Sequence, residues 1–305
     1  MLFTTVRSSL KSIYHKAAFS TKANPKSNVE PVKLAFASYE ATSGVEGPPP
    51  LVIMHGLFGS KGNWNSLCKV YHQKTLPPRK IFAVDARNHG DSPHSSEHTY
   101  RHLAEDIKAF MDSFKIKKAS LMGHSMGGRA MMLFSLHYPE MVDKLIVADI
   151  SPVQTSPSLS SMPGLFDLML TTNLPKSGAM STARNKVEMQ LATKISDKGL
   201  RQFLLTNLIQ KSDGSFAWRI NIQALVANFK NNIAAFPSTN DLTFGGPVLF
   251  VGGGASDYIQ KNDHRQIKKI FPAAKFHYID GAGHWLHSEK PAEFLKTTLD
   301  FLNSK

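Results

Sequence analysis

Short runs of apolar residues recur along the chain, and longer stretches between them carry apolar residues at every third or fourth position. The short runs are typical of buried strands, and the longer stretches are typical of amphipathic helices. Strands that alternate with helices predict an α/β fold, with a mostly parallel sheet and helices on both faces. We expect strands near residues 33–39, 51–54, 81–84, 118–122, 145–149, 247–251 and 275–279.

This alternation stops between Pro152 and Pro247. Amphipathic patterns there predict short helices at residues 164–170, 183–194, 200–210 and 222–229. We therefore expect one domain over residues 30–305, with a helical insertion at about 152–246 that forms a lid over a hydrophobic pocket. Candidates for the pocket wall are the apolar residues Met162, Leu165, Phe166, Met169, Leu204, Trp218 and Phe229.

The pentapeptide Gly123-His124-Ser125-Met126-Gly127 lies between a predicted strand and a predicted helix. Strand, G-x-S-x-G and helix in this order describe a nucleophile elbow, a sharp turn that exposes the serine hydroxyl above the sheet. Only glycine-sized neighbours let the strand and the helix pass each other in such a turn. The pattern therefore identifies Ser125 as a candidate nucleophile.

A second glycine turn, His55-Gly56-Leu57-Phe58-Gly59, follows the predicted strand at 51–54. A turn of this type supplies one amide of an oxyanion hole, and the residue after the nucleophile supplies the other. We expect these donors to be the backbone amides of Leu57 and Met126. Each such donor contributes about 2.7–4 kcal/mol to the stabilisation of a transition state.

A serine hydroxyl becomes a good nucleophile only when a neighbouring base takes its proton, so a histidine is required. His284 follows the predicted strand at 275–279 and lies on the glycine-rich loop Gly281-Ala282-Gly283. A histidine after the last strand, late in the chain, matches the order Ser before His that accompanies a nucleophile elbow. We predict that His284 is the base, and that other histidines lie at the surface or the pocket rim: His89, His94 and His287.

The imidazole needs a carboxylate to hold its tautomer, and two aspartates follow predicted strands. Asp149 ends the strand at 145–149, and Asp257 follows the strand at 247–251, where hydrolases with this elbow usually carry the acid. Counted from Pro247, however, the usual position falls on Ser256, one residue before Asp257. We favour Asp149, which ends its strand at the same edge as Ser125, and keep Asp257 as the alternative. Asp280 would instead close the loop that carries His284 through a hydrogen bond within a turn.

Five blocks of sequence carry a family resemblance: HGLFGSKGNW, VDARNHGDSPHS, GHSMGGRAMM, ADISPV and AGHWLHSEKP. Together they resemble the alpha/beta hydrolase domain-containing protein 11 group and its small bacterial esterase relatives, from about residue 48 to the C-terminus. The resemblance makes Ser125 the nucleophile and His284 the base. It supports Asp149 as the acid, because the bacterial relatives place the acid there and have serine in the later position.

Animal members of the group have also been assigned an acid in the inserted region, after a Trp-Arg-x-Asn-Leu-Asp pattern. This chain has Gln223 at that position, which argues against the third location. The resemblance further implies esterase or diacylglycerol-lipase-like activity, a place in the mitochondrial matrix, and an association with the 2-oxoglutarate dehydrogenase complex. Within the second block, we expect Asp85 and Arg87 to brace loops.

Residues 1–29 contain no Asp or Glu but carry five cationic residues, among many Ser and Thr. Apolar residues from Phe3 to Ala17 recur on one side of a helical wheel, and Arg7, Lys11 and Lys16 lie off that side. An amphipathic, basic and acid-free leader predicts a mitochondrial transit peptide. A secretory signal is disfavoured because the leader lacks an uninterrupted apolar stretch.

The leader supplies five of the thirteen net positive charges, which leaves +8 on the body. The lysines of the body are dispersed, so the charge gives little support to nucleic-acid binding. Cys68 is the only cysteine, which excludes an intramolecular disulfide and a cysteine-rich metal site. Gly252-Gly253-Gly254 matches neither a dinucleotide fingerprint nor a P-loop, so we expect no cofactor and no metal. No apolar stretch approaches the length of a transmembrane helix.

These observations predict a serine hydrolase that cleaves carboxylic esters, with lipid or acyl substrates favoured by the apolar insertion. Two other functions stay open at this point. An acyltransferase would form the same acyl-enzyme and resolve it with an alcohol. A binding or chaperone-like partner of an enzyme complex would keep the fold without needing the chemistry. Aspartate-nucleophile enzymes such as dehalogenases and epoxide hydrolases are excluded by the serine at position 125.

Overall fold

The computed structural model describes residues 29–40, 47–239 and 241–304. The predicted leader at 1–29 therefore lies outside the described residues, except for Val29. The prediction that it is a transit peptide is not addressed by the fold.

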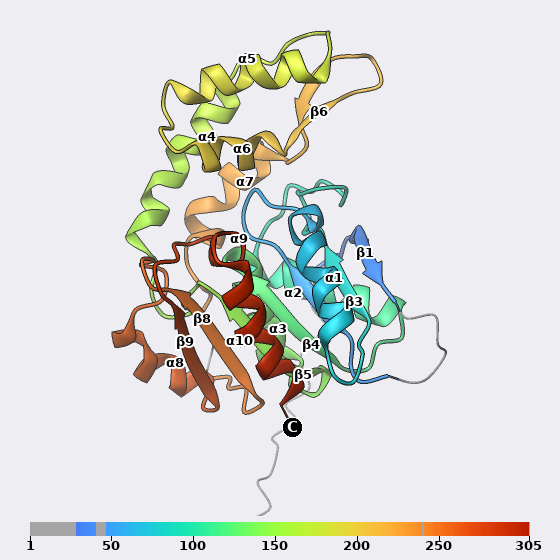
Figure 1. Ribbon diagram of the computed structural model, residues 1–305, viewed down its shortest axis with the longest axis vertical. Helices are drawn as coiled ribbons and strands as arrows, with labels where there is room; N and C mark the ends of the chain where they lie inside the picture. Colours follow the sequence, from blue (N-terminus) through green and yellow to red (C-terminus); the bar gives the residue numbers. More distant parts are fainter. Residues whose placement is uncertain (1–28, 41–46, 240, 305) are drawn as a thin grey trace, which may run out of the picture.

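A seven-stranded sheet forms the centre of the molecule, in the order β1-β3-β2-β4-β5-β8-β9 (Figure 1). β1 pairs with β3 in the antiparallel sense, and all other neighbours are parallel. The predicted α/β class with a mostly parallel sheet is confirmed. The strands are β1 (Phe36–Tyr39), β2 (Leu51–Met54), β3 (Ile81–Val84), β4 (Ala119–His124), β5 (Val142–Ala148), β8 (Val248–Gly253) and β9 (Ala274–Ile279).

Helices cover both faces of the sheet, because successive strand residues point to opposite sides and both sides are apolar. On β2, Val52 and Met54 belong to the core under α2 (Tyr100–Ser113), α3 (Met126–His137) and α8 (His264–Ile270). Leu51 and Ile53 belong to the core under α1 (Asn65–Lys74) and α10 (Pro291–Asn303). Cys68 packs in this second core as a fully buried residue.

The segment between β5 and β8 forms a separate layer above one edge of the sheet (Figure 1). It contains α4 (Met162–Thr171), α5 (Met180–Ala192), α6 (Lys198–Leu205), α7 (Ile222–Asn228) and the short strands β6 (Leu208–Gln210) and β7 (Phe216–Trp218). Short turns of 3-10 or π type complete the chain: Lys61–Trp64, Pro139–Met141, Pro157–Ser161, Phe229–Ile233 and Lys261–Asp263, together with α9 (Leu286–Glu289).

For one helix of this segment, the predicted C-terminal end was wrong. The helix expected over 200–210 ends at Leu205, and β6 pairs with β7 as an antiparallel hairpin. The turn between them contains Asp213-Gly214, with Gly214 at a φ of +84°. Asp-Gly is a favoured hairpin turn, and the strand pairing outweighs the local helical periodicity.

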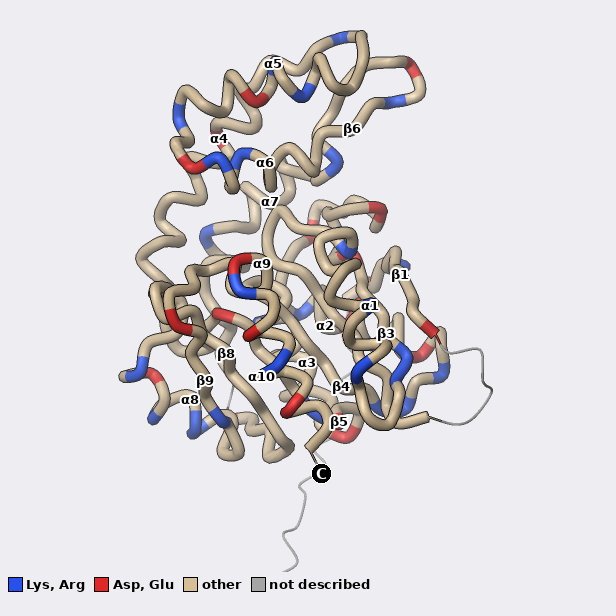
Figure 2. Tube along the Cα trace, in the orientation of Figure 1, with Lys and Arg blue, Asp and Glu red and all other residues tan. Residues whose placement is uncertain are grey.

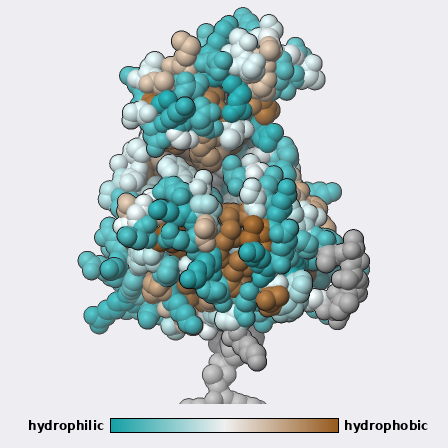
Figure 3. Space-filling view, viewed as in Figure 1, coloured by the Kyte–Doolittle hydropathy of each residue, from teal (hydrophilic) through white to brown (hydrophobic). Residues whose placement is uncertain are grey.

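The inserted segment has its own apolar core, which also includes Phe58 from the turn after β2. Four of the predicted pocket-wall residues, Phe166, Met169, Leu204 and Phe229, are buried in that core, and Trp218 packs against it. Only Met162 and Leu165 of the predicted set line the large cavity described below. Figure 2 shows Lys, Arg, Asp and Glu residues spread over both the sheet layer and the inserted segment. Figure 3 shows hydrophobic atoms at the junction of the two layers and a larger hydrophobic patch on the sheet layer below it, while the rest of this face is mostly hydrophilic. No helix in the described residues has the length and apolar character needed to span a bilayer.

Candidate active site

Ser125 stands between the end of β4 and the start of α3, with φ 52° and ψ −119°. This strained conformation lets the chain reverse sharply above the sheet. The flanking glycines make it possible. A Cβ on Gly123 would lie 2.3 Å from the carbonyl oxygen of Gly127, and a Cβ on Gly127 would lie 2.4 Å from that of Met54. The Ser125 hydroxyl borders a large cavity as a result.

A chain of hydrogen bonds joins Ser125 to two residues from distant parts of the sequence. The Ser125 Oγ lies 3.0 Å from His284 Nε2, and His284 Nδ1 lies 2.8 Å from Asp149 Oδ2. His284 comes from the loop after β9, and Asp149 follows β5 at the same edge of the sheet. The structure thus brings together the three residues favoured on sequence grounds.

Asp149 is fully buried, and the protein provides several donors for its carboxylate. The Gly253 amide donates to Oδ1 at 2.9 Å, and the Ser256 hydroxyl donates to Oδ2. A buried carboxylate without such donors would carry a large desolvation cost. Ser256, at the position where an acid is expected on sequence grounds, donates to Asp149 instead.

Asp257, the alternative acid, contacts different groups. Its carboxylate accepts hydrogen bonds from the Ser156 hydroxyl at 2.6 Å and from the Ser158 hydroxyl at 3.0 Å. His284 makes its carboxylate contact with Asp149. The one-residue displacement noted in the sequence therefore directs Asp257 toward the inserted segment, away from the imidazole. Gln223, at the third location, lies on the exposed side of α7.

Two further side chains hold His284 in place. The Tyr258 ring stacks on the imidazole, with centroids 3.6 Å apart and planes inclined by 17°. His124 Nε2 lies 2.8 Å from the His284 carbonyl oxygen. Burial and the neighbouring His287 hold the pKa of His124 well below its usual range, so its ring is neutral and can donate only from one nitrogen at a time.

The turn after β2 is fixed by hydrogen bonds around Phe58. The Phe58 amide donates to His89 Nε2 at 3.2 Å, and the Phe58 carbonyl accepts from Asn207 Nδ2 at 2.8 Å. Among the described residues, the amides of Leu57 and Met126 have no hydrogen-bond partner in the protein. Leu57 borders the cavity, and Met126 begins α3 directly after Ser125. Both amides are therefore available to an oxyanion.

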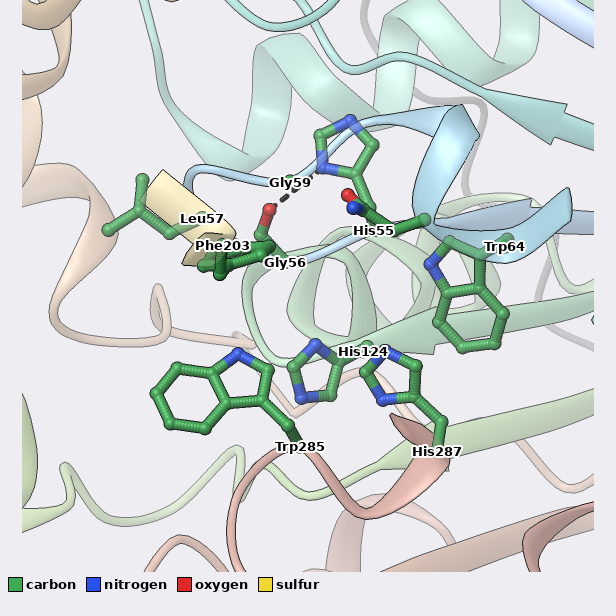
Figure 4. Close-up of a pocket in the computed structure, with 10 residues that line it drawn as sticks. His55, Gly56, Leu57, Gly59, Trp64, His124, Phe203, Trp285 and His287 are labelled. Atoms are coloured by element: carbon green, nitrogen blue, oxygen red, sulfur yellow. Dashed lines mark hydrogen bonds between the residues drawn. The ribbon is translucent and has the colours of Figure 1, made fainter. Parts of the chain in front are cut away.

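Two histidines predicted at the surface or the pocket rim are buried instead. His89 is fully buried behind the Phe58 turn, and His287 stacks on Trp64 with centroids 4.5 Å apart. Figure 4 shows His287 beside His124 and Trp64, around a small pocket of about 20 Å³. His94 is exposed, as expected. The periodicity of the sequence did not indicate that His89 and His287 are buried, because their rings pack between loops rather than on one face of a helix.

Asp85 and Arg87 brace loops, as predicted. Asp85 accepts a hydrogen bond from the Lys61 Nζ at 2.6 Å, and Arg87 forms a buried ion pair with Asp106 at 2.6 Å. Within the described ranges, no group of three His, Cys, Asp or Glu residues is arranged to hold a metal ion.

A cavity of about 640 Å³ lies between the inserted segment and the sheet edge, and Ser125 and His284 border it. Its volume is within the range of sites that bury most of a drug-sized ligand. The apolar wall comes largely from the insert: Leu159, Met162, Leu165, Ile195, Leu200 and Phe203. Sequence periodicity did not single out Phe203, although its place on the polar-apolar boundary of α6 could have indicated an outward position.

Comparisons with known proteins agree with this geometry. A family model described as alpha/beta hydrolase fold matches residues 49–291. The mouse protein named sn-1-specific diacylglycerol lipase ABHD11 is 40% identical over 265 residues, which cover 87% of this chain and 84% of the relative. The Escherichia coli protein named esterase YbfF is 31% identical over 256 residues, covering 83% of this chain and 93% of the relative.

Among solved structures, one described as a marine microorganism esterase superposes with a TM-score of 0.80 at 36% identity. The match covers 88% of this chain and 99% of that structure. The family model, the relatives and this structure therefore match the chain over most of its length. The chain belongs to the alpha/beta hydrolase family and, within it, to the alpha/beta hydrolase domain-containing protein 11 group.

Proposed function

We propose that this enzyme is a serine hydrolase that cleaves carboxylic esters through an acyl-enzyme on Ser125. The observation that carries the proposal is the continuous hydrogen-bonded path from the Ser125 hydroxyl through His284 to the buried carboxylate of Asp149. A serine beside a base that is itself oriented by a third group is the arrangement that activates a hydroxyl for attack.

The reaction follows from the positions of these groups. Ser125 Oγ attacks the ester carbonyl while His284 Nε2 takes its proton. The amides of Leu57 and Met126 bind the oxyanion of the tetrahedral intermediate. His284 then protonates the leaving alcohol. A water molecule attacks the acyl-enzyme while His284 takes its proton, and His284 then returns that proton to Ser125 Oγ as the bond to the acyl group breaks and the carboxylic acid leaves. Asp149 stabilises the imidazolium and fixes its tautomer throughout.

For the substrate, we propose lipid esters, with diacylglycerol as the first to test. The cavity above Ser125 is lined on the side of the insert by apolar residues that suit an acyl chain. The relative named sn-1-specific diacylglycerol lipase supports the same substrate class. In this account the inserted segment at about 152–246 acts as the lid of the acyl site.

The proposal is tested by the release of oleic acid from 1,2-dioleoylglycerol. The wild-type chain should release it, Ser125→Ala should not, and the control Ser113→Ala, on the exposed side of α2, should match the wild type. Added ethanol separates the two acyl-enzyme chemistries. Oleic acid as the main product supports a hydrolase, whereas ethyl oleate as the main product would make the enzyme an acyltransferase. No product of either kind would favour the non-catalytic binding role.

We also propose that the chain acts in the mitochondrial matrix, on the basis of the basic, acid-free pattern of residues 1–29. Fusion of these residues to a fluorescent reporter should direct it to mitochondria, and a diffuse signal would reject the location. The family resemblance supports an association with the 2-oxoglutarate dehydrogenase complex. Co-purification of the tagged chain with that complex from mitochondria tests it.

A further inference from the structure

Asp257 is an ionisable residue of the cavity that the proposed mechanism does not use. It lines the same cavity as Ser125 and follows directly after Ser256, the residue that supports Asp149. Although partial burial raises the pKa of its carboxyl group, hydrogen bonds from Ser156 and Ser158 lower it below its usual value. Asp257 therefore carries a negative charge at neutral pH, on the wall of the cavity that Ser125 also lines.

The serines near Asp257 donate their hydroxyl hydrogens to acceptors within the protein. Ser156 Oγ donates to Asp257 Oδ1 at 2.6 Å, and Ser158 Oγ donates to Oδ2 at 3.0 Å. The Ser158 amide also donates to Oδ2, at 3.3 Å. Ser161 Oγ donates to the Ser158 carbonyl oxygen at 2.8 Å. Ser158, Ser161 and Asp257 all line the cavity. Because the hydroxyl hydrogens of the two serines are donated elsewhere, these residues present hydrogen-bond acceptors to a ligand.

Unused acceptor capacity remains on this strip. A carboxylate has about four lone-pair sites, and the protein fills three of those of Asp257. Each serine oxygen that has donated its hydrogen still has lone pairs to offer. A ligand group that fits such a surface must donate hydrogen bonds. At this strip a phosphate or carboxylate group would meet acceptor oxygens and the negative charge of Asp257.

We propose that Ser158, Ser161 and Asp257 form an acceptor strip that binds a free hydroxyl on the alcohol half of the ester. This inference rests on the proposed function and specifies its substrate: neutral acylglycerols with an unesterified hydroxyl, rather than anionic phospholipids. The strip and the apolar wall share one segment, because Leu159, Met162 and Leu165 alternate with its serines. The acyl chain would thus contact the apolar wall, and the free hydroxyl would bind to the acceptor strip of the same cavity.

The cavity lining also contains one lysine and one further aspartate. Lys194 and Asp197 come from the connection between α5 and α6, carry opposite charges, and lie three residues apart. Neither shares a hydrogen bond with Asp257 in the described part of the chain. The strip is the part of the lining where Asp257 lies together with two serine oxygens.

The test compares three oleate esters: 1,2-dioleoylglycerol, its 3-O-methyl ether, which lacks the hydroxyl hydrogen, and ethyl oleate, which has no head group. The wild-type chain should hydrolyse dioleoylglycerol with a kcat/KM on the order of tenfold above that of the methyl ether, since a hydrogen bond to a charged acceptor has about this effect. Asp257→Asn should bring that ratio close to one. The control Asp213→Asn changes an aspartate that also binds a serine, Ser215, but lies on an exposed turn. It should keep the wild-type ratio.

Three results would overturn the acceptor strip while ester hydrolysis stands. The wild-type chain could show equal rates with the free hydroxyl and the methyl ether. Asp257→Asn could keep the wild-type preference. Asp257→Asn could lose activity equally on all three esters, which would place Asp257 in the chemistry or the fold. If the wild-type chain cleaves none of the three, including ethyl oleate, the proposed function fails and the strip fails with it.

Discussion

Arg129 lies one turn after Ser125 on α3, and its backbone amide donates a hydrogen bond to the Ser125 carbonyl oxygen at 3.1 Å. Its guanidinium is only 1% exposed and has no carboxylate within ion-pair distance among the described residues. It donates instead to backbone carbonyls at both ends of the inserted segment: Ser151, Gln154, Ile233 and Ala234. The helix that begins directly after Ser125 thereby also anchors the inserted segment.

Replacement of this guanidinium should loosen the insert. Arg129→Leu leaves several buried carbonyl groups without donors, and we expect a loss of about 2–4 kcal/mol in the free energy of unfolding. We also expect the substitution to lower kcat/KM more for a long-chain ester than for an acetate ester, because only the long chain contacts the inserted segment. Urea unfolding and the two rates check this. Arg265→Leu, at an exposed arginine of α8, is the control. Equal losses on both esters would contradict a role in holding the acyl site.

Substitution of each aspartate tests which carboxylate orients His284. Asp149→Asn should lower kcat on ethyl oleate by about 10³–10⁴-fold, because an amide cannot hold the required tautomer of His284. Ser256→Ala should cost less, about tenfold, since it removes one of the donors to the carboxylate. Steady-state rates decide the matter. A loss of this size in Asp257→Asn, with Asp149→Asn near wild type, would reverse the assignment.

The buried histidines predict a loss of stability in mild acid. Burial lowers the pKa of His98 and His287 to about 3, and it also lowers the pKa of His55, His89 and His124. In the unfolded chain these rings titrate near pH ~6.5. Below that pH the unfolded state binds more protons than the folded state, so the free energy of unfolding falls. Each ring contributes a slope of about 1.4 kcal/mol per pH unit down to its folded pKa.

Urea unfolding on both sides of pH ~6.5 measures this slope. His287→Gln should reduce the slope by the share of one ring. A stability that stays flat between pH ~6.5 and pH ~5.5, where carboxylates are still mostly ionised, would show that the rings are protonated within the fold.

The sheet and the meeting of Ser125, His284 and Asp149 at its edge could be predicted from the sequence because their signals are local. An apolar run such as Leu51–Met54 is buried on both faces and has few alternatives to a parallel strand. The turn at Ser125 requires glycines at fixed positions, and both clash distances confirm that need. The position of His284 followed from its glycine loop after the last strand. Signals of this kind depend on only a few neighbouring residues.

Other features depend on contacts between distant segments. Helical periodicity over 200–210 could not reveal that Leu208 pairs with Trp218 in a hairpin. Likewise, Phe166 and Phe203 both lie in amphipathic helices, yet one fills the core of the insert and the other faces the cavity. The partners of Asp257 lie about a hundred residues upstream, so its role on the cavity wall has no local signature.

The central claim is that Ser125 is an activated nucleophile, and covalent labelling tests it most directly. The full-length chain and Ser125→Ala would each be treated with a fluorophosphonate, and adducts would be measured by intact mass. The account predicts one adduct on the wild-type chain and none on Ser125→Ala. An unlabelled wild-type chain, or equal labelling of both proteins, would contradict it.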